Sequence, residues 1–321
     1  MWDQLGWLPP EPPTLANLLS WYPTPLPLLP TVALAAAAFY LSGVVCLRRK
    51  RRRWPWPRTV SFLLGCTALA AVTGLGIEGY GFRLFSAFMF QHLTLSILVP
   101  PLLILGAPGT LLLRATPHRG LGRLVLIAAL AGLRSRLARV VLHPGFTIPV
   151  FLFGYYGLYL SDIFDAAAST WVGHTMLEFL FLVSGILFIV PILSVDPLPM
   201  RQTDLGRFLD IFVEMPLHVF IGVILMMAPR TLTETFASPP AQWGIDPVAD
   251  QAVAGALAWS YGEPVAVLTV LIFAIRWRRE EERTAVRRDV DNGEHDQELA
   301  AYNAYLQRLR QTPRDSRLPE S

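Results

Sequence analysis

Three histidines lie inside long apolar segments of the chain, and each has a second potential metal ligand on the same predicted helix face. The ligand pairs are Met89 with His92, His174 with Glu178, and His218 with Met226. Their members are three, four and eight residues apart, and these spacings return to one face of a helix. Imidazole, thioether and carboxylate groups on facing helices predict a site for a cuprous or cupric ion, open towards the outer side of the membrane.

A second interpretation stays open for each of these residues. Histidines in membrane helices also form interhelical hydrogen bonds, and methionines at helical spacing also serve as packing. For Asp250 and Glu263 we expect hydrogen bonds that orient the ligands or join neighbouring helices. The two cysteines, Cys46 and Cys66, are not spaced as a thiolate metal site, so we expect inert buried thiols.

Seven apolar segments must position these side chains, and each is long enough to cross a membrane, which takes about 20 helical residues. They are Leu26 to Leu47, Thr59 to Ile77, Leu84 to Leu113, Pro144 to Ser161, Val172 to Val195, Phe208 to Pro229 and Gln251 to Ile275. The sequence therefore predicts an all-α integral membrane protein, a bundle of about seven transmembrane helices within residues 26–276. The other predicted parts are an extracytoplasmic segment (1–25), an interfacial helix near 121–142, and a charged cytoplasmic tail (277–321) with a short amphipathic helix.

Basic residues are concentrated in alternate gaps between these segments. Twenty-five of the 27 Lys and Arg residues follow this alternation. The first 25 residues contain none, whereas the next gap contains RRKRRR and Arg58. Because basic residues mark cytoplasmic loops, we expect the N-terminus outside and the C-terminus in the cytoplasm. The N-terminal stretch is acidic and Pro-rich where a signal peptide would be basic, so we expect the first apolar segment to be retained.

Composition excludes several classes of protein. Hydrophobic residues make up 53% of the chain and charged residues 16%, which is typical of one membrane domain. The net charge of +3 needs no nucleic acid as partner, because the basic side chains meet anionic lipid. Lys50 is the only lysine, so a retinal Schiff base in the last helix is excluded. The sequence has no phosphate-loop, serine-hydrolase or zinc-protease motif, and we therefore expect no enzyme.

Several motifs, taken in order, resemble a known family. They are QHLTLSILVPPLLILGAPGTLLLRA, GHTMLEFLFLVSGILFIVPIL, MPLHVFIGVILMMAPRTL, DQAVAGALAWSYGE and the tail phrase DQELAAYNAYLQRL. In order and spacing they are similar to the motifs of the multi-span CtaG family of cytochrome c oxidase assembly factors, and the tail resembles that of its actinobacterial members. The resemblance extends from about Arg83 to the C-terminus.

The resemblance implies a multi-pass plasma-membrane protein needed to mature the haem–copper oxidase, with copper delivery as the mechanism. The implied partners are the lipid bilayer, copper, and oxidase subunits or other assembly factors. His92, His174 and His218 fall in the QH, GH and MPLH motifs. Further histidines are frequent in the family at places that here hold Phe88, Glu178 and Leu180.

Two other functions stay open at the level of sequence. A copper or small-solute transporter is favoured by Pro100, Pro101 and the Gly106–Pro108 turn, which must kink or break the third segment. Asp210, Glu214 and His218 follow one another at intervals of one turn and together suit a relay across the membrane. The other alternative is a structural partner that holds oxidase subunits without binding metal.

Overall fold

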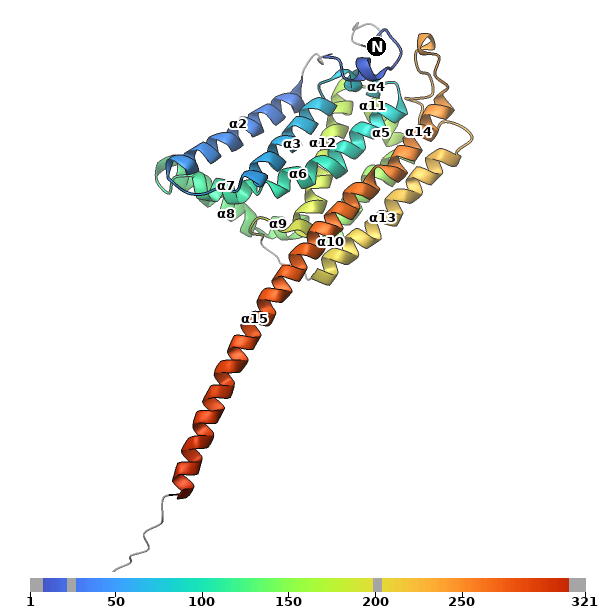
Figure 1. Cartoon of the computed structure of the whole chain (residues 1–321). Helices are drawn as coiled ribbons and strands as arrows, with labels where there is room; N and C mark the ends of the chain where they lie inside the picture. Colours follow the sequence, from blue (N-terminus) through green and yellow to red (C-terminus); the bar gives the residue numbers. More distant parts are fainter. Residues whose placement is uncertain (1–7, 22–26, 199–203, 312–321) are drawn as a thin grey trace, which may run out of the picture. The chain divides into compact units, whose positions relative to one another are not determined.

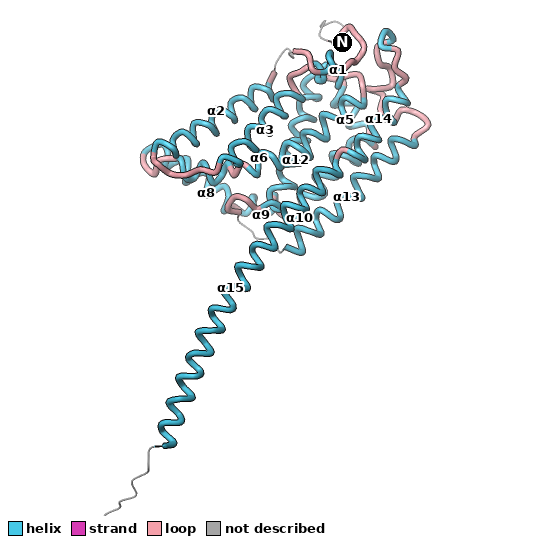
Figure 2. Tube along the Cα trace, viewed as in Figure 1, coloured by secondary structure: helices cyan, strands magenta, loops and turns pink. Residues whose placement is uncertain are grey.

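The computed structural model describes residues 8–21, 27–198 and 204–311, and over these ranges it is all-helical apart from one isolated backbone bridge (Figures 1 and 2). Its contacts divide the chain into two units, Met1–Val270 and Leu271–Ser321. The first unit holds every predicted metal ligand. The second consists, within the described residues, of the later part of the last helix.

The helices of the first unit follow one another with short connections. They are α1 (Leu15–Leu18), α2 (Leu28–Arg49), α3 (Trp56–Val72), α4 (Gly76–Gly81), α5 (Phe85–Leu93), η2 (Thr94–Leu98), α6 (Val99–Leu105), α7 (Pro108–Ala115), α8 (Gly120–Arg134), α9 (Arg136–Val141), α10 (Pro144–Leu152), η3 (Phe153–Gly157), α11 (Asp162–Ala168), α12 (Trp171–Leu193), α13 (Asp204–Met227), η4 (Ala241–Trp243) and α14 (Pro247–Ser260). Helix α15 (Gly262–Gln311) continues from this unit into the second. Inside the bundle α13 packs on α14, α14 on α5, α3 on α2 and α6, and α12 on α6.

Three stretches of the described chain are long and apolar enough to cross a membrane. They are Leu28–Arg49, the nearly continuous run Phe85–Ala115, and Trp171–Leu193. These agree with the first, third and fifth predicted segments. The second forms a 17-residue helix, η3 interrupts the fourth, and the seventh is divided between α14 and α15. The count of seven spans and the sides of the termini therefore remain predictions.

The third apolar segment is broken where its prolines and glycines predict. A π-helical turn, η2, precedes Pro100 and Pro101, which lack the N–H groups that a regular helix needs there. Farther along, Ala107 adopts a left-handed conformation with φ 50° and ends the helix. Helix α7 begins anew at Pro108, and Asp196 accepts hydrogen bonds from the N–H groups of Gly109 (2.9 Å) and Thr110 (2.7 Å).

A similar carboxylate fixes the beginning of α5. Asp250, on α14, accepts hydrogen bonds from the backbone N–H groups of Phe85 (2.6 Å) and Ser86 (3.3 Å) and from the Ser86 hydroxyl. The expected interhelical bonds of Asp250 are thus confirmed. The next residue, Gln251, accepts from Leu232 N–H and so holds the loop that follows α13. Asp250 and Gln251, adjacent in the sequence, therefore attach α14 to the start of α5 and to the loop after α13.

The N-terminal segment packs over α4. The Tyr80 hydroxyl donates to the carbonyl of Glu11 (2.9 Å), and Gly76 N–H donates to the carbonyl of Ser20 (2.8 Å). An added Cβ at Gly76 would lie 2.1 Å from the Asn17 carbonyl oxygen, so this contact requires glycine. Residues 8–21 therefore shield α4 on one side.

The C-terminal tail is more regular than the sequence predicts. A short amphipathic helix is expected around Leu299 to Leu309, but α15 runs without interruption to Gln311. The tail has no proline before Pro313, and opposite charges one turn apart, such as Arg278 and Glu282 (3.4 Å), support an exposed helix. The predicted helix near 121–142 is present as α8 and α9, and its location in the membrane interface remains a prediction.

We expect Asp250→Ala to lower the free energy of unfolding by about 1–3 kcal/mol, because it leaves the buried donors at the start of α5 without partners. Chemical unfolding of the detergent-solubilised protein measures this change. Asp246→Ala is the matched control, since the exposed Asp246 caps its own helix through one bond to Ala249 N–H. Loss of that cap should cost about 1 kcal/mol or less. Equal losses in the two variants would contradict the role assigned to Asp250.

Candidate metal centre

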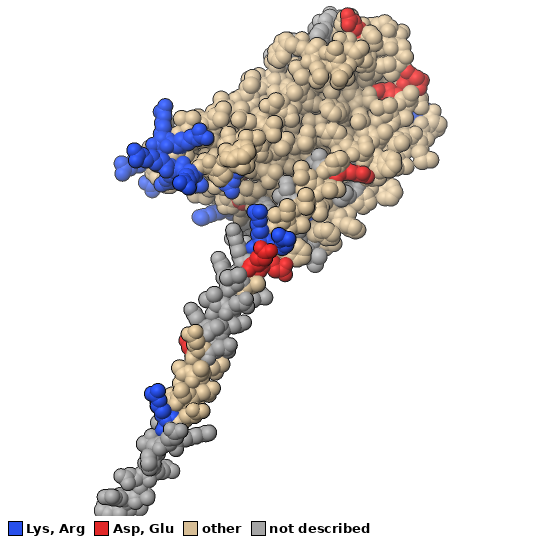
Figure 3. Space-filling view, in the orientation of Figure 1, with Lys and Arg blue, Asp and Glu red and all other residues tan. Residues whose placement is uncertain are grey.

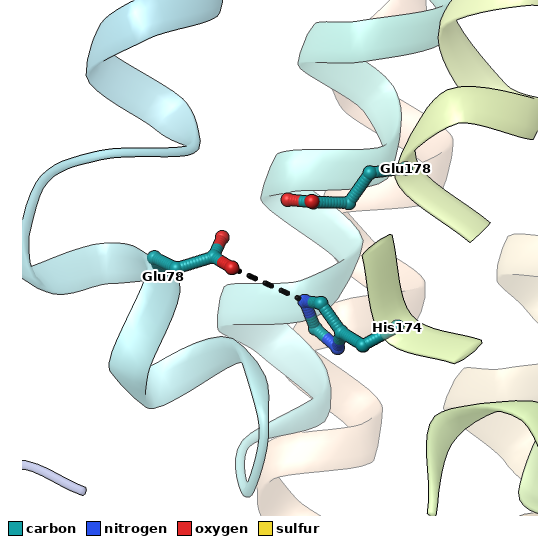
Figure 4. Close-up of side chains that lie close together, drawn as sticks. All are labelled: Glu78, His174 and Glu178. Atoms are coloured by element: carbon teal, nitrogen blue, oxygen red, sulfur yellow. Dashed lines mark ion pairs between the residues drawn. The ribbon is translucent and has the colours of Figure 1, made fainter. Parts of the chain in front are cut away.

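Three titratable side chains meet in the interior near α4 and the first turns of α12. Glu78, His174 and Glu178 are 2%, 1% and 3% exposed, and one ligand atom from each lies within 4.8 Å of the other two. Figure 4 shows the Glu78 carboxylate directed towards the His174 ring, with Nε2 of His174 3.8 Å from Oε1 of Glu78. We call these three residues the triad.

The backbone explains why the three side chains converge. His174 and Glu178 are four residues apart on α12 and so share one face. The Thr170 hydroxyl accepts a hydrogen bond from Gly173 N–H (3.0 Å) and fixes where α12 begins. Glu78 comes from α4, a short helix of sequence GIEGYG whose glycines are all buried. Small residues on both sides of Glu78 let this helix approach its neighbours closely.

Gln91 positions the Glu78 carboxylate. Its side-chain NH₂ group donates to Oε2 of Glu78 (2.5 Å) and to the carbonyl of Val72 at the end of α3 (3.0 Å). The amide oxygen of Gln91 fills the space beside Gly81, where an added Cβ would lie 1.9 Å from it. The Q of the QH motif therefore acts on the triad through Glu78.

The Glu78 carboxyl lies outside the spanning segments, between α3 and α5. Burial raises its pKa from the ordinary 4.5 to about 7, although hydrogen bonds from its neighbours oppose part of this shift. One of these hydrogen bonds joins Glu78 to Glu178, whereas two ionised carboxylates in one dry space would repel each other. A bound cation would offset both the burial of the carboxylates and their mutual repulsion.

Several polar atoms of this space have no hydrogen-bond partner among the residues that the structure describes. They are Nε2 of His174, Oε1 of Glu178 and Oε1 of Gln91. Buried polar atoms are nearly always bonded, so these atoms make the triad a candidate ligand site. The three ligand atoms lie within 4.8 Å of one another, so small shifts of the side chains would bring all three to bonding distance of one ion.

His92 lies in a separate aromatic environment. Its ring stacks on Phe181 (3.7 Å between centroids) and Tyr155 (4.4 Å), and its Nδ1 is hydrogen-bonded to the Tyr159 hydroxyl (2.7 Å). Phe88 contacts both Phe181 and His174. The Phe88 ring therefore lies between the triad and Phe181, on which His92 stacks.

The other predicted ligands have different surroundings. Met89 is fully buried. Met226 is 39% exposed, and its Cγ packs against Gly255 of α14. The side chain of His218 lies outside the described residues. Of the six predicted ligands, His174 and Glu178 thus lie close together, and metal binding by all six stays a prediction.

Sequence reasoning missed Glu78. It lies in a short gap between apolar segments, where a carboxylate reads as a solvent-facing loop residue. The available signal was the glycines at positions 76, 79 and 81, which indicate close packing rather than a loop in water. The Gln at position 91, one residue before a predicted ligand, was a second signal, because a buried amide needs a partner.

We expect Glu78→Gln to stabilise the metal-free protein at pH 8 by on the order of 1–3 kcal/mol. The carboxyl holds its proton in the folded protein up to about pH 7 but loses it near pH 4.5 when unfolded. Folding stability of the parent therefore falls as the pH rises from about 4.5 to about 7, and the amide removes this decline. Unfolding measured from pH 5 to pH 8 tests the prediction, with the exposed Glu298→Gln as control. Parallel pH profiles for Glu78→Gln and the parent would refute it.

Comparisons with known proteins identify the family. The family model for the cytochrome c oxidase caa3 assembly factor, Caa3_CtaG, matches residues 38–280. Uncharacterized proteins of Mycobacterium bovis and Mycobacterium tuberculosis are each 35% identical to the chain, over 96% of it and 47% of their own length. One of Mycobacterium leprae is 33% identical over 96% of the chain and 48% of its own length.

The chain thus spans about half the length of these curated relatives. No solved structure matches it. The family match covers all three residues of the triad and the four motifs before the tail, and it confirms the resemblance carried by those motifs. The chain belongs to the Caa3_CtaG family of cytochrome c oxidase assembly factors.

Proposed function

We propose that the chain is a non-enzymatic, multi-pass protein of the plasma membrane that binds copper at the triad and hands it to the oxidase during assembly. The observation that carries this proposal is that Glu78, His174 and Glu178 bring buried ligand atoms within 4.8 Å of one another. Of these atoms, Nε2 of His174 and Oε1 of Glu178 have no hydrogen-bond partner among the described residues. Burial of two carboxylates beside an imidazole is costly without a cation. A cargo ion supplies the missing charge, and family membership supplies the oxidase as the destination.

The donor set favours a divalent ion over a cuprous one. One imidazole and two carboxylates are hard or intermediate ligands, and among first-row divalent metals such sites bind Cu²⁺ most tightly. No thiolate contributes to the triad, and three protein ligands leave coordination positions open. A site of this kind exchanges its metal more readily than a closed thiolate site, as delivery requires. His92, His218, Met89 and Met226 are proposed as further ligands along the transfer route.

The first test is metal binding by the purified protein. Removal of the imidazole in His174→Ala should abolish stoichiometric Cu²⁺ binding at micromolar metal, measured by equilibrium dialysis and elemental analysis. The exposed His118→Ala is the matched control and should bind as the parent does. Retention of one copper per chain in both His174→Ala and Glu78→Gln would exclude the triad as the site.

A gain-of-function variant tests the same site in the opposite direction. The ring centroids of Phe88 and His174 are 5.3 Å apart, so Phe88→His would bring a second imidazole next to the triad. We expect about a tenfold or larger increase in Cu²⁺ affinity. Phe151→His is the control, because Phe151 is equally buried but contacts Tyr155 and Phe188 instead. Tighter Cu²⁺ binding by Phe151→His but not by Phe88→His would contradict this geometry.

The cellular test is the copper-to-haem ratio of the terminal oxidase purified from cells that carry His174→Ala. Oxidase that keeps its haem but loses copper supports delivery. Full copper and normal activity would favour the metal-free structural partner. Normal oxidase together with lost copper uptake by membrane vesicles would favour the transporter.

A further inference from the structure

A second chemical site lies where α2 meets α3. A pocket of about 750 Å³ is lined by six arginines and two tryptophans. Its residues are Arg48, Arg51, Arg52, Arg53, Trp54, Pro55, Trp56, Arg58 and Arg114. Figure 3 shows Lys and Arg gathered at this end of the bundle, with acidic side chains elsewhere on the same face. We call it the arginine pocket.

Trp54 forms a fixed floor for the arginine pocket. The indole is 8% exposed, and its N–H donates to the Tyr40 hydroxyl (3.2 Å), which in turn donates to the carbonyl of Gly106 (2.8 Å). The guanidinium carbons of Arg58 and Arg114 lie 5.2 and 5.7 Å from the centre of the Trp54 ring. Both guanidinium groups are thus held in place by cation–π contacts.

The turn that brings the other arginines together is strained. Helix α2 ends in a Schellman motif, in which Arg52 N–H donates to the Leu47 carbonyl (3.0 Å) and Arg51 N–H to the Arg48 carbonyl (2.9 Å). Arg51 occupies the left-handed position of this motif with φ 55°. Glycine usually takes that position because it has no Cβ to clash. A charged residue here costs stability, which points to a use for the charge.

The positive charge of the pocket is not neutralised within the described part of the chain. None of its six arginines forms an ion pair with a described carboxylate. Six guanidinium groups in one concavity repel one another, and an anion with several oxygen acceptors relieves that repulsion. Planar guanidinium groups bind phosphate oxygens in pairs, so a phosphate ester matches the pocket in both charge and geometry.

An apolar groove of about 410 Å³ lies next to the arginine pocket, between α2 and α7. Tyr40 lines this groove, and its hydroxyl accepts the hydrogen bond from Trp54 of the arginine pocket, so the two spaces adjoin. The same helix α2 carries exposed apolar side chains such as Phe39 (67%) and Val45 (47%), as expected of a surface that faces lipid. Trp56 at the rim is 70% exposed, and tryptophan is enriched at membrane–water interfaces.

We propose that the arginine pocket and this groove together bind one anionic phospholipid. The phosphodiester lies among the guanidinium groups, and an acyl chain follows the groove between α2 and α7. The bound lipid neutralises the pocket and fastens the α2–α3 turn to α7. This proposal does not depend on the metal centre.

Native mass spectrometry of the full chain in detergent tests the proposal, with phosphatidylglycerol and phosphatidylcholine of identical acyl chains as probes. We expect the parent to retain phosphatidylglycerol selectively. The variant Arg58→Gln/Arg114→Gln should bind phosphatidylglycerol about thirtyfold more weakly, because each lost charge lowers the affinity by roughly the same factor. The matched control Arg134→Gln/Arg139→Gln removes two exposed arginines from α8 and α9 and should bind as the parent does. Equal retention of the two lipids would overturn the proposal.

Arg51→Gly separates lipid binding from a structural role. Glycine relieves the left-handed strain, so the melting temperature in lipid-free detergent should rise, while phosphatidylglycerol affinity falls about fivefold with the lost charge. A rise in both the melting temperature and the phosphatidylglycerol affinity would refute the proposal. Inorganic phosphate and glycerophosphoglycerol, which lack acyl chains, identify the source of the ligand. Competition by either one at the concentration of the lipid would assign the pocket to a free phosphate compound instead.

Discussion

The carboxylate of Asp250 binds the first two backbone N–H groups of α5, and the arrangement of the triad depends on that contact. Helix α5 carries Gln91, whose amide holds Glu78, and Phe88, whose ring packs against His174. A membrane protein has little water to satisfy the free N–H groups at a helix start. A side chain from another helix therefore does so, and it fixes the register of α5 against α14.

The triad has the features of a site maintained at the expense of stability. Natural cores rarely place two carboxylates and an imidazole together without ion pairs or hydrogen bonds for each. Here Gln91 satisfies only part of Glu78, and the ligand atoms of His174 and Glu178 are left unpartnered. Stability is commonly sacrificed at functional sites, and the proposed cargo ion would offset the cost of this arrangement.

The triad and the arginine pocket, both in the first unit, carry opposite charges. The triad consists of acids and a histidine enclosed by α4, α5 and α12, under the N-terminal segment. The arginine pocket lies where α2 turns into α3 and contains no acid. An exposed cluster of arginines suits an anion, and a buried group of carboxylates suits a cation. The proposed copper ion and the proposed anionic lipid would therefore occupy places that do not compete.

The sequence alone determined the helical class, the apolar segments that form α2 and α12, the break at Gly106–Pro108, and the family. Each of these follows from local composition or from motifs read along the chain. It also identified His174 and Glu178, because a spacing of four residues on one helix is visible in the sequence. Only the tertiary structure decided that Glu78 completes the triad and that His92 is enclosed by aromatic rings. The contacts of α12 with α4 and α5 join residues about 80 to 100 positions apart, and no local pattern encodes such distances.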